Sequence, residues 1–119
     1  MISEELKKAR FFVFQHKSMN NENLIVTSLA HVTGVSDGII VFWSVKQEEK
    51  HPTRMALPFS AIKGALAIPD ADLEASLPRN KKPSNGKIRV ATDYEYFTEQ
   101  VMPFLQKQDI QSFYSANKA

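Results

Sequence analysis

The stretch Gly38-Ile39-Ile40-Val41-Phe42-Trp43-Ser44-Val45-Lys46 holds the only tryptophan of the chain and its densest run of β-branched and aromatic residues. Apolar side chains fill both alternation sets, namely Ile39, Val41, Trp43 and Val45 on one and Ile40 and Phe42 on the other. Successive side chains of a strand point to opposite faces, so a strand that is apolar on both faces is covered on both. The stretch therefore predicts the central strand of a sheet, with Trp43 in the core.

The neighbouring segments predict further strands around this one. Residues 24–45 predict an antiparallel hairpin, because an alternating segment is followed by a glycine-containing turn at 34–38 and then by the central strand. Residues 53–59 predict a third strand, and Pro58 places it at an edge or ends it, since proline donates no ladder hydrogen bond. The segment 60–68 leaves a short helix and a fourth strand open.

Two helices are predicted near the ends of the chain. Ser3 is a suitable N-cap for a helix that runs to about Lys17, although the apolar run at 11–14 fits the start of a strand as well. Thr92 and Glu95 have the spacing of a capping box, which predicts the start of a C-terminal helix.

These segments together predict an α+β fold, and the length of 119 residues fits a single domain over 1–119. The expected sheet is largely antiparallel, has four or five strands centred on residues 39–45, and is covered by an N-terminal and a C-terminal helix. A strand hairpin, a third strand with Leu57-Pro58-Phe59-Ser60-Ala61-Ile62 and a closing helix is similar to the bacterial pleckstrin-homology-like or GRAM-type arrangement. This resemblance transfers no functional residue. It implies, as the alternative fold, a partly open barrel that the C-terminal helix closes.

Composition excludes several classes of protein. The chain has no cysteine, which excludes disulfides, thiolate nucleophiles and sites that bind zinc or iron–sulfur clusters through cysteine. The charged N-terminus lacks the apolar core of a signal peptide, and no apolar run approaches the roughly 20 residues of a membrane span. We therefore expect a cytoplasmic protein without a membrane span.

The strongest local charge signal is a run of five cations with no intervening acid, namely Arg79, Lys81, Lys82, Lys87 and Arg89. Residues 78–86 predict a loop, and 87–92 predict a strand that turns Ile88 and Val90 inward. Such a loop can meet the phosphates of nucleic acid or another anion through diffuse charge. Because no aromatic residue lies within the run to stack on a base, a solvated loop is the favoured interpretation.

Catalytic and metal-binding patterns are incomplete. Residues 34–38 spell the nucleophile elbow G-x-S-x-G around Ser36, yet a strand follows instead of the helix that this motif requires. The acids Asp70 and Asp72 resemble the start of a calcium loop, but the glycine and the final acid that set its geometry are missing. No metal site and no cofactor is predicted.

The sequence thus predicts a small, non-catalytic, cytoplasmic binding or interaction module that acts through a protein partner or a small ligand. Self-association into a homo-oligomer is compatible with this function. The candidate contact residues are the five cations, together with His31 on a strand face and Tyr96, which points away from the apolar helix stripe. The second hypothesis is a nucleic-acid or phosphate binder that uses the basic loop 79–89, and the third is a small hydrolase that uses Ser36 or His31.

Overall fold

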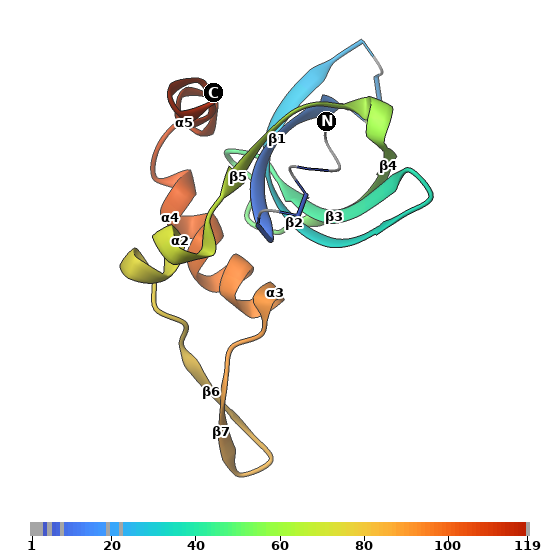
Figure 1. The fold of residues 1–119 in the computed structure, drawn as a ribbon. Coiled ribbons are helices and arrows are strands. Elements are labelled where there is room, and N and C mark those ends of the chain that lie inside the picture. The colour runs from blue at the N-terminus through green and yellow to red at the C-terminus, as the bar shows by residue number, and fades with distance from the viewer. Residues whose placement is uncertain (1–3, 5, 8, 19, 22, 119) are drawn as a thin grey trace.

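An antiparallel five-stranded sheet with the strand order β4-β3-β2-β1-β5 forms the body of the computed structural model, which describes residues 4, 6, 7, 9–18, 20, 21 and 23–118. The strands are β1 (Phe11–Lys17), β2 (Ile25–Ser36), β3 (Ile39–Val45), β4 (Thr53–Pro58) and β5 (Ile62–Ile68). The sheet curls into a ring, with β4 and β5 at its two edges (Figure 1). The predicted α+β fold with an antiparallel sheet of four or five strands is confirmed.

Two expectations about the sheet are wrong. The sheet is centred on β2 and not on residues 39–45, because β1 and β5 extend it on the far side of β2. The helix expected to run to Lys17 is wrong from Phe11 onward, since Phe11–Lys17 is strand β1. Residues 11–14 are buried on both faces of this strand, which explains why every position is apolar. The expected cap, Ser3, lies outside the described residues.

The structure also decides between helix and strand for residues 60–68. A single 3₁₀ turn, η1 (Phe59–Ala61), follows the edge strand β4. Strand β5 then begins at Ile62 and pairs with β1, so this segment is a strand and not a helix. The predicted edge position of the strand that ends at Pro58 is confirmed.

The concave face of the sheet surrounds an aromatic core. Phe12, Phe14 and Phe42 are all 0% exposed, and the rings of Phe14 and Phe42 meet edge to face with centroids 5.1 Å apart. Leu6 and Ala9, from the segment before β1, pack against the same cluster. The interior of the ring is therefore filled with side chains over most of its length.

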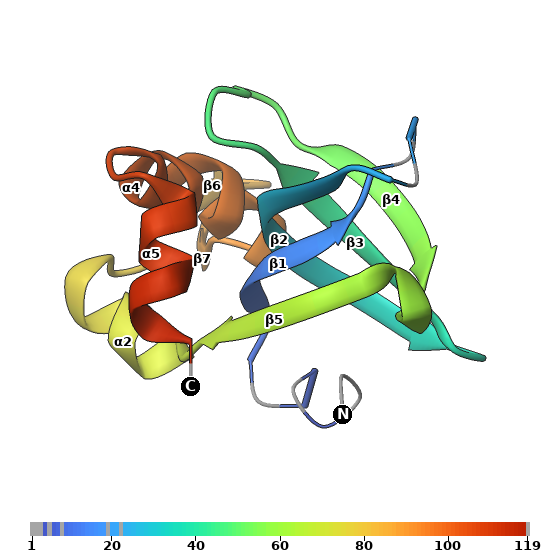
Figure 2. The same cartoon turned by 90° about the horizontal axis from the view of Figure 1, so that it is seen from above.

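The convex face carries the helices (Figure 2). They are α2 (Asp70–Ser76), α3 (Asp93–Tyr96), the π-helical turn η2 (Phe97–Val101), α4 (Met102–Gln106) and α5 (Ile110–Asn117). The predicted capping box is confirmed: Glu95 N donates to Thr92 Oγ1 at 3.2 Å, and Thr92 N donates to Glu95 Oε1 at 2.8 Å. None of the helices in the described part of the chain combines the length and apolar character that crossing a bilayer needs.

The helices reach only part of the convex face. Val45 belongs to the core that β1, β2 and the helices share, and its neighbours in that core include Phe97 and Val101. The alternative in which the C-terminal helix closes the ring is wrong, since the buried helix side chains belong to this convex core.

Trp43 is half-buried, beside Tyr94 with ring centroids 5.0 Å apart, so it borders the core and does not lie within it.

A second, two-stranded sheet extends away from the ring (Figure 1). It consists of β6 (Lys81–Ser84) and β7 (Lys87–Val90), so the predicted loop 78–86 is wrong over the first of these strands. The expectation that Ile88 and Val90 point inward is also wrong, because they are 68% and 56% exposed.

Candidate functional site

Most of the predicted basic site is neutralised within the molecule. Three of the five cations form ion pairs with acids of α3 or η2. Arg79 pairs with Asp93, Lys82 with Glu99 and Arg89 with Glu95. The hydrogen bond from Arg89 is the main reason why the pKa of Glu95 falls to about 2. Only Lys81 and Lys87 form no ion pair with another described residue. The cations thus attach the hairpin to the helices, which weakens the hypothesis of a phosphate-binding loop.

Arg79 and Tyr96 lie in the more buried part of the contact between the hairpin and the helices. Asp93 accepts hydrogen bonds from both Arg79 and Arg10, and these hold its pKa below the ordinary value although burial acts in the opposite direction. The guanidinium of Arg79 lies over the Tyr96 ring, 4.9 Å from its centroid. Tyr96 is 1% exposed and its hydroxyl donates to the Leu77 carbonyl, so the expected surface contact at Tyr96 is wrong.

His31 is a core residue. It is 5% exposed, its ring lies 5.3 Å from that of Phe11 and 5.7 Å from that of Phe97, and burial lowers its pKa. Ser36 lies five positions further along the same strand, which corresponds to about 16 Å in extended backbone. The two residues proposed for a hydrolase therefore do not meet, and no group of three metal-ligating side chains occurs among the residues that the structure describes.

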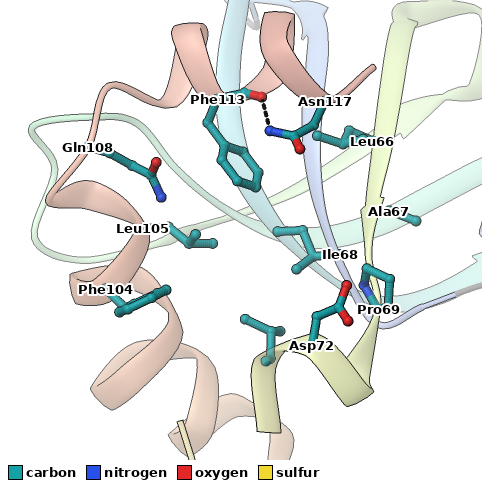
Figure 3. A pocket seen from close by; sticks show the side chains of 11 residues that line it. Leu66, Ala67, Ile68, Pro69, Asp72, Phe104, Leu105, Gln108, Phe113 and Asn117 are labelled. Atoms are coloured by element: carbon teal, nitrogen blue, oxygen red, sulfur yellow. Dashed lines mark hydrogen bonds between the residues drawn. The ribbon is translucent and has the colours of Figure 1, made fainter. Parts of the chain in front are cut away.

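The structure instead assembles a groove that the sequence did not predict. It lies between β5, α2, α4 and α5, and its volume is about 360 Å³. Figure 3 shows Ile68, Leu105 and Phe113 facing one another across it. Leu105 is almost fully buried, whereas Phe104 at the margin is 38% exposed. The walls are therefore mainly apolar and open to solvent at one side.

The position of α5, which forms one wall, depends on a glycine in β5. The Tyr114 hydroxyl lies where a Cβ at Gly64 would be, so α5 approaches the strand closely. The Asn117 side chain donates to the Phe113 carbonyl at 2.8 Å in the same helix (Figure 3). This close approach brings Phe113 and Asn117 into the groove.

Three polar side chains line the groove: Asp72 from α2, Gln108 after α4 and Asn117 from α5. Asp72 is the only charged residue in the lining, and it forms no ion pair with another described residue. A mainly apolar groove with a few polar groups is the usual form of a ligand-binding site. The charge of this one is negative.

The groove follows the backbone of the edge strand β5. Four consecutive residues, 66–69, line it, although alternate side chains of a strand point to opposite faces. One edge of β5 pairs with β1, and no backbone hydrogen bond from another described segment reaches residues 62–68 at the other edge. The groove is therefore lined by the end of a strand whose second edge receives no backbone hydrogen bond from the described part of the chain.

One signal in the sequence pointed towards this site. Phe104 and Leu105 are adjacent in a helix, and adjacent helical positions do not share a face. Leu105 enters the core, so Phe104 is left at the margin of the groove. The remaining lining comes from segments between residues 66 and 117 whose proximity only the tertiary structure reveals.

Comparison of this chain with known protein families, with curated proteins and with solved structures finds no match.

Proposed function

We propose that this chain is a non-catalytic binding module whose groove between β5, α2, α4 and α5 holds an extended segment of a protein partner. The observation that carries the proposal is that the end of the edge strand β5 lines the groove, while the second edge of β5 pairs with no other described strand. An exposed strand edge offers hydrogen-bond donors and acceptors to an added strand, while an adjacent pocket selects its side chains.

The lining predicts which side chains the partner presents. Phe104, Leu105 and Phe113 favour a large apolar side chain, whose burial stabilises a complex by about 1.5–3 kcal/mol. The single carboxylate of Asp72 favours a lysine or arginine beside that side chain, and because Asp72 is exposed this pair contributes about 0–1 kcal/mol. The expected segment is thus apolar and cationic.

The other hypotheses have less support. A nucleic-acid or phosphate binder would rely on residues 79–89, where three of the five cations already pair with acids. A hydrolase of the serine–histidine type has less support, because Ser36 Oγ donates to the exposed Asp37 carboxylate at 3.4 Å and His31 Nδ1 has no hydrogen-bond partner among the described residues. The cytoplasmic location and a homo-oligomeric state stay predictions.

A library of random peptides displayed on phage tests the proposal directly. Selection on the immobilised chain is expected to enrich peptides with a large apolar residue next to lysine or arginine. Asp72→Asn, which removes the charge and preserves the shape, is expected to weaken binding of a selected peptide by up to about fivefold. Phe104→Ala is expected to weaken it by a similar factor, at small cost in stability because the side chain is 38% exposed.

The matched control is Glu48→Gln, which removes the same charge from an exposed turn residue that does not line the groove. Its binding should equal that of the unmodified chain. Selected peptides that bind Asp72→Asn and Phe104→Ala as well as the unmodified chain would contradict the proposal, as would nuclear magnetic resonance (NMR) shifts confined to the β6–β7 hairpin.

A further inference from the structure

A second pocket lies at one end of the ring, apart from the groove. Its volume is about 310 Å³, and its lining comes from β1, β2, β3, β4, the turn after β3 and two residues after β1, Ser18 and Asn20. The concave face, aromatic elsewhere, becomes polar here: His16, Ser28 and Ser44 are 1%, 0% and 4% exposed. The mouth of a small barrel is a common place for a ligand site.

His16 forms an uncharged wall of this pocket. Its Nδ1 lies 2.8 Å from the Lys17 carbonyl oxygen and its Nε2 lies 3.1 Å from Ser28 Oγ. Nδ1 therefore carries the proton and donates to the carbonyl, and Nε2 accepts from the Ser28 hydroxyl. Burial, followed by the nearby charge of Lys46, lowers the pKa of His16, so the ring is neutral near pH 7.

Ser44 brings an unused hydroxyl to the pocket. Its side chain lines the cavity and is 4% exposed, yet its Oγ has no hydrogen-bond partner within the described part of the chain. Among the described residues, the fully buried side-chain atoms that lack a partner are His31 Nδ1 and Asp70 Oδ1, so Ser44 Oγ is accessible from the cavity, where its hydroxyl can donate to a ligand.

Lys46 and Glu49 place opposite charges in the same lining without forming an ion pair with each other. The Lys46 backbone N–H donates to Glu49 Oε1 at 2.8 Å, which fixes the carboxylate at the mouth and leaves its second oxygen available. A purely anionic ligand would be repelled by Glu49, and a purely cationic ligand would be repelled by Lys46. Only a ligand with both charges uses both groups.

We propose that this pocket binds a free α-amino acid as its zwitterion. The carboxylate lies between the Lys46 ammonium and the Ser44 hydroxyl, and the α-ammonium donates to Glu49. An apolar side chain lies against Val26 and Met55, the two apolar residues of the lining.

Three ligands of nearly equal shape test this inference by NMR titration of the full chain. Leucine carries both charges, leucinamide lacks the carboxylate, and 4-methylpentanoate lacks the ammonium. Leucine is expected to bind at least about tenfold more tightly than either analogue, since each loses one charged hydrogen bond. Saturable shifts are expected at the amides of Ser44 and Met55.

Two isosteric variants assign the charges. Lys46→Gln is expected to weaken leucine and 4-methylpentanoate about tenfold, and to strengthen or leave equal the binding of leucinamide, since it removes a like charge. Glu49→Gln, which keeps an acceptor for the Lys46 N–H, is expected to weaken leucine and leucinamide, and to strengthen or leave equal the binding of 4-methylpentanoate. The controls Lys63→Gln and Glu48→Gln alter exposed charges outside the lining and should change nothing.

The titration of the unmodified chain decides the matter even where a variant fails to fold. Either analogue binding as tightly as leucine, or the absence of saturable shifts at Ser44 and Met55, would overturn the inference. Asp72→Asn, in the groove, should bind leucine normally, so failure at one site is distinguishable from failure at the other.

Discussion

The β2–β3 and β6–β7 hairpins have the same type of turn, but their strands differ in burial and in what holds them to the rest of the molecule. Both turns place two consecutive residues at positive φ, namely Asp37 at 52° and Gly38 at 76°, and Asn85 at 50° and Gly86 at 75°. These are the Asp-Gly and Asn-Gly turns that suit the twist of two strands. The β2–β3 hairpin buries Ile40 and Phe42 completely, whereas β6–β7 leaves Ile88 68% exposed. A turn sequence thus specifies a hairpin without specifying what covers it.

The forces that hold the two hairpins differ accordingly. The strands β2 and β3 pair with neighbours in the sheet and contribute to both of its cores. The β6–β7 hairpin is joined to the helices by ion pairs such as Lys82–Glu99 at 2.5 Å. Exposed ion pairs contribute about 0–1 kcal/mol each. We therefore expect β2–β3 to govern global stability and β6–β7 to open locally.

The largest difference is expected between Phe42→Ala and Ile88→Ala. Phe42 is fully buried, and its truncation should lower the free energy of unfolding by about 3–5 kcal/mol through lost transfer energy and a new cavity. Ile88 is mostly exposed, and its truncation should change stability by no more than about 0.5 kcal/mol. Urea denaturation measures both, and equal losses would break the comparison.

A change of pH is expected to produce the next largest difference in stability between the sheet and the β6–β7 hairpin. Burial lowers the pKa of His16 and His31 below 6.5 in the folded chain. Below pH 6.5 the unfolded chain therefore binds protons at these histidines that the folded chain does not bind. Stability is complete above about pH 7 and falls as the pH drops, by at most about 1.4 kcal/mol per pH unit for each histidine. Glu95 acts in the same direction at lower pH: its pKa is about 2, so its stabilising contribution is present above 4.5 and is lost as the pH falls towards 2.

Urea denaturation at pH 7.5, 6.5 and 5.5 measures the effect on the sheet, and NMR titration of Glu95 measures the hairpin contact. At pH 5.5 the sheet should be weakened while the Arg89–Glu95 pair persists. Stability that does not change between pH 7.5 and 5.5 would show that neither histidine is protected from protonation.

A matched pair of glycine substitutions gives the smallest and sharpest contrast. At both Gly38 and Gly86, the position that a Cβ would take has no other atom within 4 Å, so alanine at either glycine adds only backbone strain. That strain costs about 1–2 kcal/mol. Gly38→Ala should lower global stability by this amount, whereas Gly86→Ala should mainly remove hydrogen-exchange protection from β6 and β7. Equal global losses would mean that β6–β7 folds as part of the sheet.

The success of sequence-based prediction follows the range of the interactions. The capping box at Thr92 and Glu95 and the hairpin turn at Gly38 involve residues a few positions apart, and both were predicted, although the turn was expected over 34–38 and strand β2 in fact runs to Ser36. The Asn85-Gly86 signal is equally local, but the surrounding cations and prolines favoured a loop, so the β6–β7 hairpin was missed. The apolar run at 11–14 fits a helix or a strand until β2 and β5 are known to flank it.

The sites were far less predictable. Arg79 and Arg89 looked like a surface for phosphates because their acidic partners are five or more positions away in the chain. Tyr96 was expected at the surface because a regular helix stripe continues through η2, where a π-helical turn changes the register.

By itself, the sequence determined the α+β class, the antiparallel hairpin around Gly38, the edge strand ending at Pro58 and the helix that begins after Thr92. These follow from alternation, turn chemistry and capping, which act over a few residues. The tertiary structure alone decided the strand order, the pairing of the cations, the groove beside β5 and the polar pocket at His16. Each of these joins segments distant in the chain, and their association is governed by burial of the whole sheet, which no local pattern encodes.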